Sequence, residues 1–233
     1  MVKKKMSLLI LFILFSIIIT GCQNIAFLNK NESSTDQNTN PAELYELGAD
    51  YYYGENGKAQ DYKRAVAYLT QSANGDNAKA QSLLGYCYEK GYGIAQDYSQ
   101  ALYWYLLAAE QDDSFGQSAL GYLYEKGYGV TQDYSQAYYW YKLAADQGDS
   151  YAQGGLAYLY MFGYGVKQDY NQAFYWAELG GKQGDEYAES ALGYLYEQGY
   201  GGVKVDLEIA KYWYGLAAEQ GNQYAIDALN RLK

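Results

Sequence analysis

The chain has 233 residues, among them 32 tyrosines, one proline and no histidine. Without histidine it cannot form a Ser/His/Asp triad, a Cys/His dyad or a histidine-ligated zinc site, which excludes much of ordinary hydrolase chemistry. We expect a non-catalytic protein with no cofactor and no metal. Its 27 acidic and 17 basic residues give a net charge of −10, which has the wrong sign for binding nucleic acid.

The first residues have the pattern of a secretion signal. Lys3, Lys4 and Lys5 precede an apolar run from Leu8 to Ile19, which is shorter than the roughly 20 residues that a membrane-spanning helix needs. We therefore predict a signal peptide over residues 1–21. The alternative is an N-terminal membrane anchor that keeps this segment.

The sequence Ile19-Thr20-Gly21-Cys22 resembles the lipobox of bacterial lipoproteins. That resemblance implies cleavage after Gly21, a diacylglycerol on the Cys22 thiol and an acylated amino terminus. Two or three acyl chains, at about 0.8 kcal/mol per buried methylene, hold a protein stably on a membrane. Residues 1–21 contain three lysines and no acidic residue, so the mature chain would have a net charge of −13.

Residues 22–40 join this expected anchor to the rest of the chain. They are rich in Asn, Ser, Thr, Gln and Asp, and no large apolar residue follows Leu28, so we predict a flexible tether. In Gram-negative lipoproteins an Asp after the cysteine is associated with retention in the inner membrane. Gln23 stands at that position, which favours the outer membrane if the cell has one. The predicted location is the bacterial cell envelope.

From residue 41 onward the chain repeats itself. Five aspartates, spaced by 36, 36, 36 and 37 residues, mark the period: Asp61, Asp97, Asp133, Asp169 and Asp206. The aromatic residues Tyr68, Trp104, Trp140, Trp176 and Trp213 keep step with them. We define repeats 1 to 5 as residues 41–77, 78–113, 114–149, 150–185 and 186–222, followed by a cap at 223–233. A period of this length predicts a solenoid.

Each repeat contains two helical stretches with glycine turns between them. Glycine after a stretch predicts a helix C-cap, and the recurring aspartate predicts the N-cap of the second helix. Small residues within the helices predict a close approach of the two: Gly85, Gly121, Ala157 and Gly193 in the first helices, and Ala101, Ala137, Ala173 and Ala210 in the second.

The repeat closely resembles the Sel1-like repeat, a relative of the tetratricopeptide repeat. The likeness is carried, in repeat 3 and its counterparts, by Leu120-Gly121, Tyr124, Gly127, Gly129, Asp133, Ala137, Trp140-Tyr141 and Ala144-Ala145. It implies an all-α, right-handed α-solenoid of five helix-pair repeats plus a C-terminal capping helix. The first helices would line a concave groove, which the family uses as a protein-binding scaffold, so we predict a protein or peptide partner.

Transferring the groove positions of tetratricopeptide repeats to this chain predicts two inward-facing rows. The first row consists of Ala49, Tyr86, Tyr122, Tyr158, Tyr194 and Arg231. The second row consists of Lys79, Phe115, Tyr151, Tyr187 and Tyr224. Repeat 4 also has Met161-Phe162 where the neighbouring repeats have Glu-Lys or Glu-Gln, and we interpret this pair as an exposed apolar docking spot. The alternative is that these tyrosines only cover helix backbone.

Other residues are predicted to be structural. We assign the tryptophan row and Tyr88, Tyr124, Tyr160 and Tyr196 to the core. Cys87 occupies a slot that holds leucine in other repeats, so we expect a buried apolar side chain rather than a reactive thiol. The recurring acidic residues are expected to face solvent. Gly180-Gly181, where other repeats have Ala-Ala, is interpreted as a point of flexibility.

Three other functions stay open. Tyrosine platforms also stack on sugars, so a peptidoglycan- or glycan-binding module is the first alternative. Some cysteine-rich Sel1-like proteins have been described as penicillin-binding or β-lactamase-like, but this chain lacks their paired cysteines and has no Ser-x-x-Lys or Lys-Thr-Gly. The third is an effector or adhesin that meets host proteins.

Overall fold

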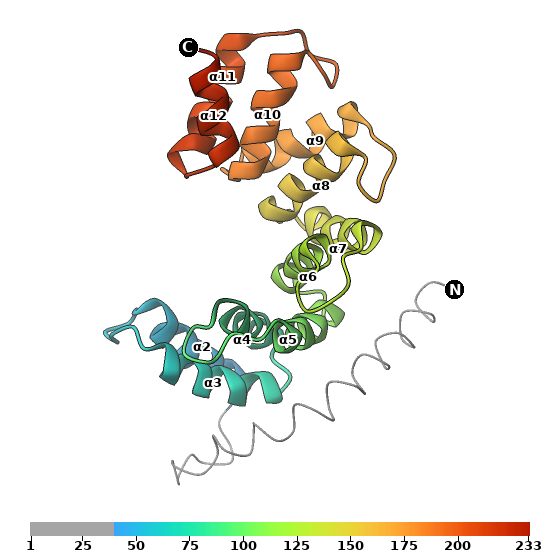
Figure 1. Cartoon of the computed structure of the whole chain (residues 1–233). Helices are drawn as coiled ribbons and strands as arrows, with labels where there is room; N and C mark the ends of the chain where they lie inside the picture. Colours follow the sequence, from blue (N-terminus) through green and yellow to red (C-terminus); the bar gives the residue numbers. More distant parts are fainter. Residues whose placement is uncertain (1–39) are drawn as a thin grey trace. The chain divides into compact units, whose positions relative to one another are not determined.

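The structure is a computed structural model that describes residues 40–233, in which all regular secondary structure is helical (Figure 1). The predicted signal peptide, the lipidation site at Cys22 and the tether up to residue 39 lie outside the described residues. Within residues 40–233, no helix has the length and apolar character needed to cross a membrane. The prediction of an all-α solenoid is confirmed.

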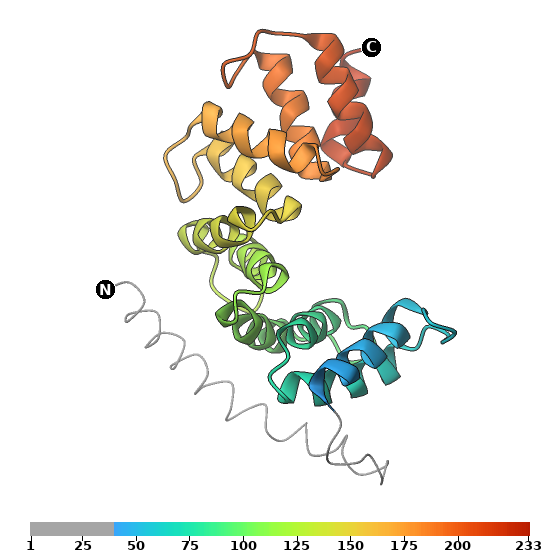
Figure 2. The same cartoon turned by 180° about the vertical axis from the view of Figure 1, so that it is seen from behind.

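The helices are α2 (Pro41–Tyr53), α3 (Tyr62–Asn74), α4 (Ala78–Lys90), α5 (Tyr98–Glu110), α6 (Ser114–Lys126), α7 (Tyr134–Asp146), α8 (Ser150–Phe162), α9 (Tyr170–Gly181), α10 (Glu186–Gln198), α11 (Leu207–Glu219) and α12 (Gln223–Arg231). Each repeat supplies two consecutive helices that pack against each other, and α12 is the predicted cap (Figures 1 and 2). The chain divides into two compact units, one ending at Gln111 and the other beginning at Asp112. The first contains α2–α5 and the second α6–α12.

The ends of the helices follow the predicted capping residues. Each second helix begins after the periodic aspartate, whose carboxylate accepts hydrogen bonds of 2.8 to 3.1 Å from two backbone N–H groups. Each first helix ends at a glycine in the left-handed region, with φ between 70° and 75°. These caps satisfy backbone groups that a helix leaves unpaired at its ends, and so fix where each element starts and stops.

The small residue of the first helix makes room for a large ring from the second. Tyr105, Tyr141 and Tyr214 are fully buried, and their rings lie directly on the helix backbone at Gly85, Gly121 and Gly193. A Cβ at Gly85 would be 2.8 Å from the Tyr105 ring, so the site accepts only glycine without a shift. The close approach predicted from the glycines is therefore confirmed.

Within each of the two units, neighbouring repeats are joined by a glycine and a tyrosine of the turn between helices. Gly165 has no room for a Cβ because it lies on the backbone of Tyr134 in the preceding repeat. The ring of Tyr164 stacks on that of Tyr134, with centroids 4.8 Å apart. The same stacking joins Tyr62 to Tyr92, and Tyr170 to Tyr200.

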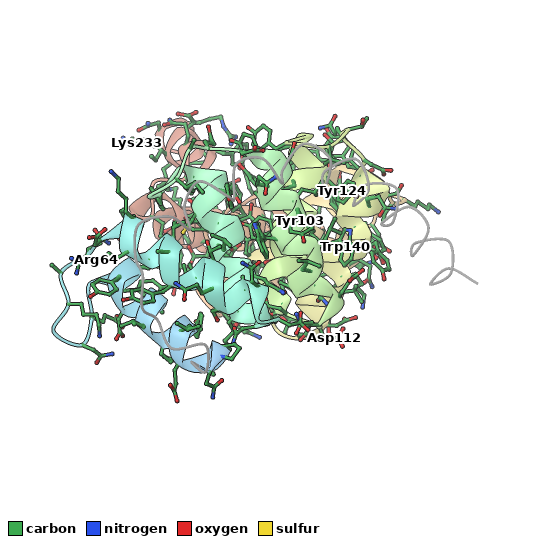
Figure 3. The ribbon with its side chains drawn as sticks, turned by 90° about the horizontal axis from the view of Figure 1, so that it is seen from below. Arg64, Tyr103, Asp112, Tyr124, Trp140 and Lys233 are labelled. Atoms are coloured by element: carbon green, nitrogen blue, oxygen red, sulfur yellow. The ribbon has the colours of Figure 1, made fainter. Side chains whose placement is uncertain are left out.

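The predictions for the core are largely confirmed. Trp104, Trp140, Trp176 and Cys87 are buried, and so is Tyr124, whereas Trp213 and the other three tyrosines of that set are half-buried. Tyr124 and Trp140 are labelled in Figure 3.

The flexible point predicted at Gly180-Gly181 is better explained by packing. Both residues are buried, and a Cβ at Gly180 would be 2.8 Å from Cβ of Ala188. These glycines permit α9 to lie close to α10.

Candidate functional site

The predicted groove residues of the second unit lie on its first helices. In that unit α8 contacts both α6 and α10, and α10 contacts the cap helix α12. Because these helices are neighbours, residues one repeat apart in sequence come close in space.

The first row of predicted groove residues is held by the turn tyrosines. Tyr158 is exposed, with 38 % of its surface accessible, and Tyr122 and Tyr194 are half-buried. Each ring contacts the tyrosine six residues further on, at centroid distances of 5.7 to 6.2 Å. In the first unit, Tyr86 lies 6.1 Å from Tyr92 in the same arrangement. These contacts fix the ring positions before any partner arrives.

The second row is more exposed and meets the first at Tyr151. Phe115, Tyr187 and Tyr224 are 42 to 50 % exposed, whereas Tyr151 is half-buried. The Tyr151 ring lies 5.9 Å from that of Tyr187 and 6.2 Å from that of Tyr122. Residues of both predicted rows are therefore brought together on α6, α8 and α10.

A small open pocket marks this meeting point. It is lined by Glu125, Lys126, Tyr141, Tyr151, Gly154, Gly155, Tyr158 and Tyr187. Its volume of about 30 Å³ has room for roughly one water molecule, far below the several hundred Å³ of a typical small-molecule site. The arrangement thus fits recognition of an extended surface rather than enclosure of a small substrate.

The prediction of an exposed apolar pair at Met161-Phe162 is half wrong. Met161 is buried, with 6 % of its surface accessible, whereas Phe162 is 48 % exposed. The ring of Phe162 lies 4.8 Å from that of Tyr158 and 5.7 Å from that of Tyr164. Tyr158, Phe162 and Tyr164 form an exposed cluster that we call the aromatic shelf.

The prediction that the recurring acidic residues face solvent is wrong for four glutamates, namely Glu89, Glu125, Glu189 and Glu197. Glu89, Glu125 and Glu197 are buried, and each accepts a hydrogen bond of 2.8 or 2.9 Å from a buried tyrosine of the second helix. The three donors are Tyr105, Tyr141 and Tyr214. A buried carboxylate needs such partners because desolvation disfavours its charge.

Each of the three glutamates that accept from a tyrosine also has one basic partner. Lys90 lies 2.7 Å from Glu89, and Lys126 lies 2.5 Å from Glu125. Repeat 5 has Gln198 at the lysine position, and there the cation comes from Arg231 of the cap helix, which pairs with Glu197. We call each set of tyrosine, glutamate and cation a triad.

Repeat 4 replaces the whole triad with apolar residues. Ala177 stands at the tyrosine position, Met161 at the glutamate position and Phe162 at the lysine position. The burial of Met161 follows from this exchange, since it occupies the site of a buried glutamate. The sequence alone could have indicated this burial. Repeats 2, 3 and 5 combine glutamate at the first position with tyrosine at the second, whereas repeat 4 combines methionine with alanine.

The triads shift the ionisation of their members. Burial raises the pKa of the Tyr141 hydroxyl, and the neighbouring Tyr151 and the carboxylate of Glu125 add to the effect. Burial alone would lower the pKa of Lys126, but the hydrogen bond and charge of Glu125 outweigh it and raise the pKa. Tyr141 therefore stays protonated and Lys126 charged at neutral pH. Among residues 40–233, no group of three or more His, Cys, Asp or Glu side chains is placed to hold a metal ion.

The fold and the repeated triads define an α-solenoid of helix-pair repeats. A family model described as Sel1 repeat matches residues 44–77, 78–113, 114–149, 150–185 and 186–222. The chain therefore belongs to the Sel1 repeat family, whose members are generally non-catalytic scaffolds that mediate protein–protein interaction.

Two solved structures share about a third of the sequence. A Sel1 repeat protein from Oxalobacter formigenes is 35 % identical, with a TM-score of 0.72 over 82 % of this chain and 75 % of the other. A protective antigen present in uropathogenic Escherichia coli strains, described as displaying an SLR fold, is 34 % identical with a TM-score of 0.68. That match covers 82 % of this chain but only 41 % of the antigen. Curated proteins gave no match.

Proposed function

We propose that this Sel1 repeat scaffold is a lipid-anchored protein of the bacterial envelope that binds a protein or peptide through the aromatic face of α6, α8 and α10. The observation that carries the proposal is the exposed cluster of Tyr158, Phe162 and Tyr164 beside Tyr187, at the meeting point of the two groove rows. Preset aromatic rings give a large contact area at little entropic cost, which suits recognition of a peptide segment.

Site-specific crosslinking in cells tests the binding face. A photoreactive residue in place of Tyr158 should capture a defined partner on illumination. The matched control is Tyr212, which is 60 % exposed on the second helix α11 and should give only background capture. Background capture at Tyr158, Tyr122 and Tyr194 alike would contradict the proposed face.

The lipid anchor is proposed from the lipobox at Cys22, which lies outside the described residues. Metabolic labelling with a fatty acid should mark the full chain and not Cys22→Ser, and the variant should move from the membrane to the soluble fraction. Label that persists in Cys22→Ser would contradict the anchor. If the chain comes from a Gram-negative bacterium, fractionation should place it in the outer membrane.

Peptidoglycan binding is the competing use of the same rings, since exposed tyrosine faces also stack on sugars. Sedimentation of the full chain with purified peptidoglycan separates the two. Complete recovery in the supernatant at moderate salt argues against the glycan, whereas retention that is lost in Tyr158→Ala and Tyr187→Ala would favour it over a peptide.

A further inference from the structure

Repeats 2 and 3 show what lies over the tyrosine that corresponds to Tyr158. The ammonium group of Lys90 lies over the Tyr86 ring, 5.4 Å from its centroid. That of Lys126 lies over the Tyr122 ring at 5.8 Å. In both repeats the chain supplies a cation to its own groove tyrosine from the next turn of the same helix.

Repeat 4 keeps the tyrosine and lacks the cation. Phe162 replaces the lysine and packs beside Tyr158 instead. Across the described part of the chain, no lysine or arginine lies over the ring of Tyr158, Phe162 or Tyr164. These rings are 38, 48 and 37 % exposed, so the aromatic shelf is accessible from solvent.

The charge around the shelf favours a cation. Residues 112–233 contain 16 acidic and 8 basic residues, a net charge of −8. The nearby Lys126 is paired with Glu125 at 2.5 Å. Burial raises the pKa of the Tyr158 hydroxyl, as do Tyr164 and Glu125, and the opposing effect of Lys126 is the smaller one. The ion pair of Lys126 and Glu125 therefore does not present net positive charge to the shelf.

We propose that the aromatic shelf of Tyr158, Phe162 and Tyr164 binds a lysine or arginine side chain of a basic peptide segment, in the place that the chain's own lysine takes in repeats 2 and 3. The inference rests on the proposed function and specifies the chemistry of the partner. A cation over an aromatic face contributes most where it is shielded from water, and three adjoining rings give that shielding on one side.

The test uses a dye-labelled peptide of alternating arginine and serine, added to the full-length chain in detergent and followed by fluorescence anisotropy at low salt. A second peptide carries citrulline, which keeps the shape of arginine without its charge. The arginine peptide should bind about threefold to tenfold more tightly. Equal binding of the two peptides would overturn the proposal.

Variants separate the shelf from general attraction to an acidic protein. Phe162→Lys restores the arrangement of repeats 2 and 3 and should weaken binding of the arginine peptide by about tenfold. Phe162→Leu should weaken this binding by about threefold. Gln198→Lys adds the same charge at the equivalent position of repeat 5 and should change affinity by less than about twofold. Equal losses in Phe162→Lys and Gln198→Lys would show that only net charge matters and would overturn the proposal.

The two proposals fail in different ways. A partner captured at Tyr158 in cells, together with equal binding of both peptides, would contradict the cation site and still support the proposed binding of a partner. A clear preference for arginine that depends on Phe162, with no partner captured in cells, would support the cation site and contradict the scaffold function.

Discussion

The hydroxyl of Tyr141 donates a hydrogen bond of 2.8 Å to the carboxylate of Glu125, and both side chains are buried. The bond connects the second helix of repeat 3 to the end of its first helix. Because the same bond recurs in repeats 2 and 5, it is a structural element of the repeat and offers the most direct test of what stabilises it.

Tyr141→Phe removes that donor and leaves the ring in place. We expect the free energy of unfolding to fall by about 1–2 kcal/mol, because a buried carboxylate loses one of its partners. Urea denaturation followed by circular dichroism measures the change. Tyr175→Phe is the control, since Tyr175 is 51 % exposed, and should stay within about 0.5 kcal/mol of the wild type. Equal effects of the two substitutions would contradict a stabilising role for the bond.

Gly121→Ala should destabilise the protein by more than about 2 kcal/mol, because the new methyl group meets the fully buried ring of Tyr141. Repeat 4 combines Ala157 with Ala177, so the double variant Gly121→Ala/Tyr141→Ala should lose less than the sum of the two single losses. A double-mutant cycle by urea denaturation gives this coupling. Additive losses would show that the glycine and the ring are independent.

Arg231→Gln removes the cation of the last triad and should lower the urea midpoint at neutral pH. The hydrogen bond from Arg231 lowers the pKa of Glu197 in the folded state, against a usual value of 4.5. The stabilising effect of this ion pair is therefore present above about pH 4.5 and is lost as the pH falls through the pKa of Glu197 in the folded state. The difference between variant and wild type should shrink over that range.

Gln198→Lys should rescue Arg231→Gln, because it recreates the Glu-Lys arrangement of repeats 2 and 3. Failure of this rescue at neutral pH, with a correctly folded single variant, would contradict the idea that the cap helix supplies the missing cation.

Asp185→Asn should stabilise the protein at neutral pH. Burial raises the pKa of this N-cap aspartate to about 6, with Glu186 and Asp149 adding to the shift, while the N–H of Ala188 opposes it. A raised folded pKa makes stability fall as the pH rises from about 4 to 6. Asparagine caps α4 and α12 in this chain, so the substitution keeps the cap and removes the charge.

The expected gain is on the order of 1–2 kcal/mol at pH 7, and the slope of stability between pH 4 and 6 should flatten. Thermal or urea unfolding across that range measures both. An unchanged slope in Asp185→Asn would mean that Asp185 does not titrate in this range.

Cys87 should not react with thiol reagents until the protein unfolds. Its side chain is fully buried, and burial raises its pKa to about 12. At pH 8 a disulfide-exchange reagent should label it only in denaturant, and Cys87→Ser should destabilise the protein, because it buries a hydroxyl at a site that holds leucine in other repeats. Rapid labelling of the folded chain would instead favour the hypothesis that Cys87 is a reactive thiol.

The sequence was sufficient to predict the repeat, the helix pairs, their caps and the close contact at the glycines. Each of these depends on local chemistry: aspartate at a helix start, glycine at a helix end, or a missing side chain where two helices meet. The position of Tyr158 and Tyr187 on neighbouring first helices followed from the repeat as well.

The sequence did not reveal the burial of Glu125 or Met161. A glutamate beside a lysine near a helix end is typical of a solvated surface, and the partner that changes this reading, Tyr141, lies 16 residues further on. The error at Met161 follows from the same cause, since the equivalent residues Glu89, Glu125 and Glu197 are buried as well. The buried Met161 can be told from the exposed Phe162 only from the structure, or from the way that pairs of repeat positions change together.

The stacking of Tyr134 on Tyr164 also means that the repeats are not interchangeable. Repeat 4 stacks Tyr164 on the ring of repeat 3 and offers Tyr170 to Tyr200 of repeat 5. The turn of repeat 1 has Glu55 and Asn56 in place of such a ring, and α11 of repeat 5 begins with Leu207. A copy of repeat 1 in place of repeat 4 would leave the Tyr134 ring without the stacking partner that Tyr164 supplies. Exchanging these two repeats would therefore disrupt the junction with repeat 3, although the composition of the chain would stay the same.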